Sequence, residues 1–195
     1  IVNGLVGSEM CIRDRFICSR LNKHERALGK RSVFNVVREV VNDSIFDRLL
    51  TVGRLDEDTT GLLLLTTDGH IVHDIASPDK NVEKTYTVKL DRELQPNDMG
   101  MLSKGLTIDL EVNGDITPFT TAPAAVSIDE QGLVSLTISE GKKRQVRRMF
   151  AALDYTVERL HRVSIGGLKL EMFGVKPGEA VEIEETLLRQ LVFDQ

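Results

Sequence analysis

The sequence predicts an α+β protein with a mostly antiparallel sheet and short flanking helices. Short strand patterns alternate irregularly with short helical patterns, which is typical of that class. The 195 residues show no internal repeat and no low-complexity linker, and a composition of 41% hydrophobic and 28% charged residues is that of an ordinary globular protein. We therefore expect one domain over residues 16–195.

Composition excludes several classes of protein. No apolar run approaches the roughly 20 residues that span a bilayer, and the first residues lack the basic start and apolar core of a signal peptide. Cys11 and Cys18 make no spaced framework, so neither a disulfide scaffold nor a zinc site is predicted, and a reducing, cytoplasmic setting is the default. The net charge of −5 argues against a protein that coats nucleic acid with its whole surface, but it is compatible with a local basic groove.

The elements are predicted in chain order from periodicity and turn residues. Residues 1–15 show no clear period, and VGSEMCIRDR resembles translated sequencing-adapter sequence, so we expect a non-native or disordered N-terminus outside the fold. Asn22 to Arg31 is a polar, basic loop, which is either a solvated connection or a contact with phosphates. Ser32 caps a short amphipathic helix that runs to about Val41.

The most informative stretch is Val52 to Gly69, VGRLDEDTTGLLLLTTDG. Leu62 to Leu65 are four apolar residues between turn signals, which predicts a strand buried on both faces. A loop that leads into such a rigid strand holds its side chains well, and this suits a catalytic group.

Asp56 in that loop has two interpretations from the residues alone. As a turn aspartate it caps the amides of Asp58 or Thr59, or pairs with Arg54, and spacing favours this common role. As a catalytic group it is a carboxylate nucleophile that Arg54 holds ionised and oriented.

The chain after Gly69 continues the mixed pattern. His70 and His73 lie three apart, but no third well-spaced ligand appears, and we predict surface histidines rather than a metal site.

The elements expected after Gly69 begin with a helix from Gly69 to Ala76 capped by Asp68, a strand from Lys84 to Leu90, and a helix from Pro96 to Lys104 stopped by Gly105. Strands from Leu106 to Val112 and Ala124 to Ile128 follow, joined through the loop Thr117 to Pro123, and a hairpin turn at 129–132 leads into Leu133 to Ser139. The last expected elements are strands from Val157 to Ile165 and Ala180 to Ile183, and a helix from Thr186 to Val192.

A second informative stretch is Glu140 to Phe150, EGKKRQVRRMF. It concentrates basic side chains in an acidic protein: Lys142, Lys143, Arg144, Arg147 and Arg148. A solvated helix start is the usual fate of a charge run. The functional alternative is a helix entrance where basic side chains and free backbone amides contact phosphates.

Three motifs resemble those of the RsuA/RluB branch of the pseudouridine synthases: GRLDEDTTGLLLLTTDG, the EKTY segment at residues 83–86, and EGKKRQVRRMF. The resemblance runs from about Phe16 to Leu188 and implies the pseudouridine synthase fold, a mixed, mainly antiparallel sheet with a central active-site cleft. It also implies an N-terminally truncated catalytic domain, since a strand with a Lys-Pro-Gly signature and a separate RNA-binding domain found in many members are missing.

The resemblance assigns roles to individual residues. It makes Asp56 the nucleophile, Tyr86 the residue against the target base, and Arg147 the cationic partner of Asp56. Further residues are expected to bind substrate: Arg54, Lys142, Lys143, Arg144, Arg148, Leu160 and Arg162.

The function that the resemblance implies is isomerisation of a specific uridine in ribosomal RNA by base flipping, without cofactor or metal. LTISEGKKRQVRRMFAAL and LHRVSIGGL are more similar to members acting on small-subunit than on large-subunit RNA. The expected partner is ribosomal RNA or a pre-ribosomal particle, with no membrane and a monomeric chain. Two other classes stay open: a glycosidic hydrolase that uses Asp56 with Glu57 or Asp58, and a catalytically inactive RNA-binding module.

Overall fold

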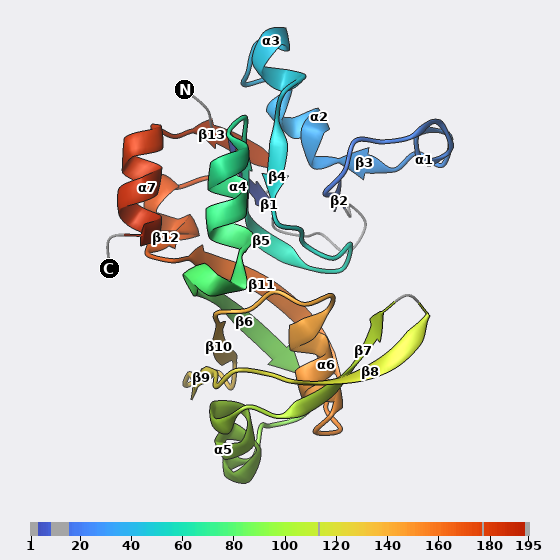
Figure 1. The fold of residues 1–195 in the computed structure, drawn as a ribbon, viewed down its shortest axis with the longest axis vertical. Helices are drawn as coiled ribbons and strands as arrows, with labels where there is room; N and C mark the ends of the chain where they lie inside the picture. Colours follow the sequence, from blue (N-terminus) through green and yellow to red (C-terminus); the bar gives the residue numbers. More distant parts are fainter. Residues whose placement is uncertain (1–3, 9–15, 113, 177, 194–195) are drawn as a thin grey trace.

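A computed structural model describes residues 4–8, 16–112, 114–176 and 178–193 (Figure 1). Its main sheet follows the order β13-β1-β5-β11-β6-β10-β9, with β4 pairing to β5 and β12 to β11. These strands are β1 (Gly4–Ser8), β4 (Leu50–Val52), β5 (Thr60–Thr66), β6 (Lys84–Leu90), β9 (Ala125–Ile128), β10 (Val134–Ile138), β11 (Val157–Ile165), β12 (Leu168–Lys169) and β13 (Glu179–Glu182). Among them only β5 and β11 pair in parallel, so the predicted mixed, mainly antiparallel sheet is confirmed.

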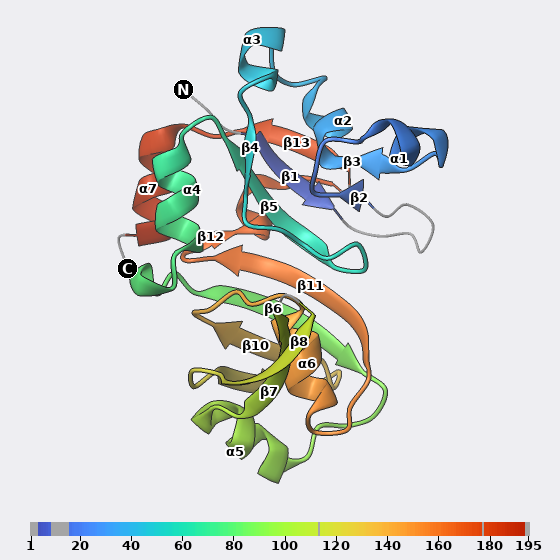
Figure 2. The same cartoon turned by 45° about the vertical axis from the view of Figure 1, so that its right-hand side comes forward.

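The leucine run forms β5 and is buried on both faces, as predicted. Because side chains alternate along a strand, Leu62 and Leu64 enter a core with helices α4 (Gly69–Ala76) and α7 (Glu185–Phe193). Leu63 and Leu65 enter a second core on the other face, with α2 (Val33–Val37) and α3 (Asp43–Phe46). Figures 1 and 2 show α4 and α7 side by side at the β5 end of the sheet.

A third core fills the other end of the sheet, where β6, β10 and β11 pack against α5 (Pro96–Lys104) and α6 (Gln145–Ala151). Val88, Leu136, Met149 and Phe150 are fully buried there. The long strand β11 lies between β5 and β6 and joins the two ends (Figure 2).

The contact between β5 and β11 requires glycine. Only Thr60 and Gly61 are in register with β11, opposite His161 and Arg162. Gly61 has φ +108°, and a Cβ at this position would lie 2.2 Å from the carbonyl oxygen of Arg162. This glycine therefore allows the loop before β5 to meet β11.

Several predicted ends of elements are confirmed. Asp68 caps α4, accepting a hydrogen bond from the His70 amide, and α5 spans the predicted residues with Gly105 as its stop. Asp154, after α6, takes the left-handed conformation at φ 62°, which aspartate tolerates. The 129–132 turn leads into β10 as expected, with the Asp129 carboxylate accepting the amides of Gln131 and Leu133.

The stretch before β4 was predicted less well. The helix expected from Ser32 to Val41 ends at Val37, although Ser32 does cap it. The loop expected from Asn22 to Arg31 contains α1 (Lys23–Ala27) with an Asn22–Glu25 capping box, and β3 (Arg31–Ser32) pairs with β2 (Phe16–Ile17). The Asn22–Glu25 capping box explains why a helix forms in this polar segment.

The loop expected from Thr117 to Pro123 was also wrong in part. Residues up to Thr120 belong to β8 (Asp115–Thr120), which makes a hairpin with β7 (Thr107–Val112). β8 pairs with β7 alone among the described strands, and an edge strand tolerates Pro118 because one of its sides needs no ladder of amide donors. Two 3₁₀ turns complete the description, Pro78–Lys80 and Leu170–Phe173.

Residues 4–8 form a strand, although the N-terminus was expected to lie outside the fold. They form β1, which lies between β5 and β13 and pairs antiparallel with both. Residues 1–3 and 9–15 lie outside the described residues, and the non-native origin of this segment stays a prediction. The physical reason for the difference is that β5 needs backbone partners, and strand pairing is made by backbone groups that any side chain leaves available.

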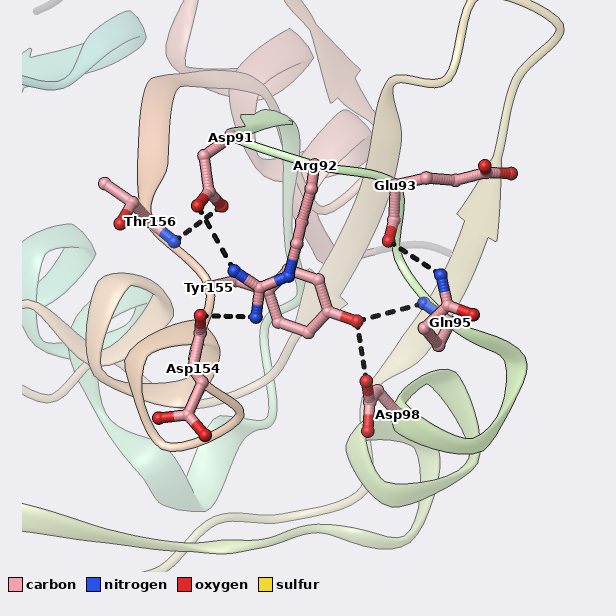
Figure 3. A network of polar contacts seen from close by, with 8 residues as sticks. All are labelled: Asp91, Arg92, Glu93, Gln95, Asp98, Asp154, Tyr155 and Thr156. Carbon is pink, nitrogen blue, oxygen red and sulfur yellow. Dashed lines mark hydrogen bonds and ion pairs between the residues drawn. The ribbon is translucent and has the colours of Figure 1, made fainter.

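A polar network holds α5 against the end of the sheet that contains β6, β10 and β11 (Figure 3). The Tyr155 hydroxyl donates to the Asp98 carboxylate over 2.6 Å and accepts the Gln95 amide over 3.1 Å. The guanidinium of Arg92 lies over the Tyr155 ring and donates to the Asp154 carbonyl over 2.6 Å. The network links the end of β6, the start of α5 and the turn before β11.

Candidate active site

A cavity of about 500 Å³ opens beside β6 and β11. Its walls are the loop of residues 53–59 between β4 and β5, and the loop of residues 139–144 between β10 and α6. Eight of the ten predicted site residues line it: Arg54, Asp56, Tyr86, Lys142, Lys143, Arg144, Leu160 and Arg162. Arg147 and Arg148 are not among its lining side chains in the described part of the chain.

The 53–59 loop positions Asp56 at this cavity. Leu55 is buried, its amide donates to the Cys18 sulfur over 3.3 Å, and the Cys18 thiol donates to its carbonyl over 3.4 Å. Asp56 itself is half-buried, and its carbonyl accepts the Thr59 amide over 2.9 Å, which closes the turn. The turn interpretation expected the Asp56 side chain to cap Thr59, but the backbone does this.

Arg147 contacts Asp58, which lies two residues after its expected partner Asp56. Its Nε lies 3.2 Å from the Asp58 carboxylate and its Nη2 donates to the Asp58 carbonyl over 2.7 Å. Its Nη1 donates to the Val157 carbonyl over 2.9 Å, and the side chain is only 13% exposed. Arg147 therefore joins the 53–59 loop to the start of β11, and it holds that loop at Asp58.

Tyr86 and Leu160 come from neighbouring strands and face the same cavity. Tyr86 pairs with Arg162 in the β6–β11 register, and Leu160 pairs with Val88. Leu160 is buried, and Tyr86 is half-buried. An apolar side chain and an aromatic ring at one opening suit a flat, partly apolar ligand.

The basic cluster divides into a cavity rim and a structural part. Lys142, Lys143 and Arg144 are exposed at the rim, and Arg144 also reaches the Asp58 carboxylate over 3.1 Å. Arg148 instead donates to the Asp109 carbonyl on β7. Arg162, expected to contact phosphate, is buried.

The helix entrance differs from the prediction of free amides. The Gln145 side chain accepts the Lys142 amide over 2.9 Å and donates to the Glu140 carboxylate over 2.7 Å. One amide of this segment is therefore already bound within the protein, and the buried Gln145 shapes the 139–144 loop.

Sequence reasoning missed Lys84, Asp58 and Gln145. Lys84 is buried and lines the cavity, with Nζ donating to the Ile75 carbonyl over 3.1 Å. Burial, and then the neighbouring Arg162, lower the pKa of Lys84 to about 8. For Lys84 the sequence signal was its place in the EKTY segment. For Asp58 it was an acidic turn that could face the basic cluster.

The described residues lack the features of two other kinds of site. No group of three His, Cys, Asp or Glu side chains gathers there in a way that could hold a metal ion. None of the described helices is both long and apolar enough to cross a membrane.

Known proteins that resemble this chain share the same sequence features and fold. The family model described as RNA pseudouridylate synthase matches residues 24–152. The chain belongs to this family. A solved structure titled "Crystal structure of pseudouridylate synthase" has a TM-score of 0.78 at 32% identity, covering 98% of this chain and 74% of that one. The predicted family and fold are thus confirmed.

Curated relatives point to one branch of this family. Ribosomal small subunit pseudouridine synthase A of Escherichia coli (strain K12) is 39% identical over 145 residues, which cover 74% of this chain and 60% of that protein. The protein of the same name from Haemophilus influenzae is 41% identical over 145 residues, which again cover 74% of this chain and 60% of that protein. The chain spans about 60% of the length of these relatives.

Proposed function

We propose that the chain isomerises a specific uridine of small-subunit ribosomal RNA to pseudouridine, with Asp56 as nucleophile. The observation that carries the proposal is the cavity that brings Asp56, Tyr86 and Leu160 together from three separate segments. The names of the curated relatives support the small-subunit substrate. Large-subunit ribosomal RNA is the alternative substrate, and a cytoplasmic setting follows from either.

The site offers what the reaction requires. Isomerisation detaches uracil from ribose, turns it and rejoins it through carbon 5, so the target base must leave its stack at a cost of a few kcal/mol. Tyr86 and Leu160 would receive the base, and the rim cations would bind the flanking phosphates. Asp56 would be the group that attacks, held by the Leu55–Cys18 contacts behind it.

The contacts in the loop argue against a glycosidic hydrolase. Such an enzyme needs a second carboxyl group as an acid, on the other side of the bond. Asp58 is already engaged by Arg144 and Arg147, and Glu57 is exposed with Lys30 3.7 Å away. Neither is placed as a proton donor for a bond beside Asp56.

The test is pseudouridine mapping with an Asp56→Asn variant. Wild-type chain is incubated with unmodified small- and large-subunit ribosomal RNA, and new pseudouridines are located by carbodiimide-dependent reverse-transcription stops. We expect a stop in the small-subunit RNA that vanishes with Asp56→Asn, because an amide is a poor nucleophile, while the fold and RNA affinity stay nearly unchanged.

Asp115→Asn, an exposed change on β8, is the matched control and should keep the stop. Appreciable turnover by Asp56→Asn would exclude the nucleophile assignment. RNA binding by wild type without a stop in either RNA would favour an inactive RNA-binding module.

A further inference from the structure

Lys84 is a buried cation at the floor of the cavity. It lies two residues before Tyr86 on β6, so the two side chains share one face of the strand, and it is 8% exposed. Its hydrogen bond to the Ile75 carbonyl reaches the last turn of α4, where a helix terminus favours a positive charge. An ammonium has three donors, so this bond leaves it able to bind a further acceptor in the cavity.

Arg162 is a second buried cation at the same floor. It is 4% exposed, and its Nε donates to the Leu62 carbonyl over 2.8 Å. Its Nη2 is also buried, with no hydrogen-bond partner among the described residues. A buried donor without an acceptor is costly, and so are two neighbouring cations. The floor therefore fits a ligand that brings acceptor atoms and negative charge.

The floor differs from the rim in the ligand that it fits. The cations at the rim are exposed and suit phosphates, which stay in contact with water. The floor cations lie among apolar side chains that suit a planar ring: Ile75, Ile138, Val146, Leu160 and Ile165. A nucleobase that becomes negatively charged combines both requirements of the floor.

We propose that Lys84, with Arg162 beside it, contacts a carbonyl oxygen of the flipped uracil and stabilises the negative charge that the ring carries during isomerisation. This rests on the proposed function. The Asp56 carboxylate bonds to C1′ as the N1–C1′ bond breaks, and the electron pair of the broken bond goes to the ring, where the carbonyl oxygens share the charge. The ring then bonds to C1′ through C5 as the Asp56–C1′ bond breaks, the C5 proton leaves to solvent, and N1 takes up a proton from solvent. Lys84 keeps its own proton throughout and acts as a fixed donor.

The protonation of Lys84 gives this role a pH dependence. Its pKa of about 8, lowered by burial and then by Arg162, means that the ammonium is lost as the pH rises through that value. Ionisable groups on the surrounding elements are Arg162 on β11, Tyr86 on β6, Arg54 and Asp56 in the 53–59 loop, Glu140, Lys142, Lys143 and Arg144 on the 139–144 loop, and His70, His73 and Asp74 on α4. The kcat/KM of the free enzyme should therefore decrease above about pH 8.

The experiment measures tritium released from uridine labelled at C5 in small-subunit ribosomal RNA, under single-turnover conditions, for wild type, Lys84→Met and Lys84→Arg. Lys89→Met, on the same strand but exposed and paired with Glu158, is the matched control. We expect Lys84→Met to lower the rate roughly 100-fold, as loss of one preorganised donor does, with RNA affinity within about threefold of wild type. Lys84→Arg should keep more activity and move the alkaline decrease in kcat/KM upward, because arginine stays protonated.

The outcomes separate the two proposals. If wild type releases no tritium, the proposed function fails; if wild type and Lys84→Met release it at similar rates, only the role of Lys84 fails. A purely structural role, through the bond to Ile75, would lower the melting temperature and leave the pH profile unchanged. If Lys84→Met does not melt cooperatively, the profiles of wild type and Lys84→Arg decide, and an alkaline decrease at the same pH in both overturns the proposal.

Discussion

At the scale of single residues, Arg147 determines the shape of the loop that carries Asp56. Its guanidinium contacts the carboxylate and the carbonyl of Asp58 and the carbonyl of Val157. Arg148, the next residue, contacts a single carbonyl on β7. The two arginines are equal in charge, so a comparison between them isolates the effect of these contacts.

We predict that Arg147→Ala lowers pseudouridine formation by roughly 100-fold and Arg148→Ala by less than about fivefold. Losing Arg147 leaves acceptors of the half-buried Asp58 and the buried Val157 without their donor, at about 1 kcal/mol or more in total, and lets the 53–59 loop move. Single-turnover rates on small-subunit ribosomal RNA provide the measurement, with circular dichroism as a check of fold. Equal losses from the two changes would mean that both act only through charge.

The sequence identified most residues of the site but not all of their contacts. Asp56, Tyr86 and Leu160 were predicted to meet, and they line one cavity. The contact of Arg147 with Asp58 could not be predicted, because Asp56 and Asp58 lie in one turn and spacing does not distinguish them, and its pairing with Asp56 stays a prediction. Lys84 was missed because a lysine on an alternating strand is normally exposed, and only the three-dimensional contacts reveal its burial.

At the scale of elements, the parallel contact between β5 and β11 holds the 53–59 loop against the strand that carries Leu160. Two pairs of residues are in register there. The backbone of Gly61 approaches Arg162 more closely than any residue with a side chain could. The leucine run itself was predictable from its length and flanks, but its parallel partner lies about 100 residues away in sequence and gives no local signal.

We predict that Gly61→Ala lowers the free energy of unfolding by about 3 kcal/mol or more and abolishes activity. The added methyl group would lie against the Arg162 backbone, which cannot rotate away as a side chain does, and alanine is also strained at a positive φ. Urea unfolding followed by circular dichroism measures the change. Gly69→Ala, at the open start of α4, is the control and should be neutral or slightly stabilising. Similar stabilities of the two variants would contradict the close approach.

At the scale of the whole molecule, an acidic protein concentrates basic side chains in one place. The chain has 25 Lys and Arg against 30 Asp and Glu, yet basic side chains gather at the cavity rim. Composition and the charge run were enough to predict this local groove. They could not predict β1, because its place in the sheet is specified by backbone pairing to β5 and β13.

We predict that the rim accounts for most of the salt dependence of RNA binding. Each phosphate contact on a single strand contributes about 0.7 to the slope of log affinity against log salt, so Lys143→Gln should lower that slope by roughly this amount. Lys104→Gln removes the same charge from α5, at the far end of the sheet (Figure 1), and should leave the slope unchanged. Filter binding of small-subunit ribosomal RNA over a range of salt concentrations measures both. If the two variants lower the slope equally, RNA binding responds to net charge, and the phosphates do not lie along the rim of the cavity.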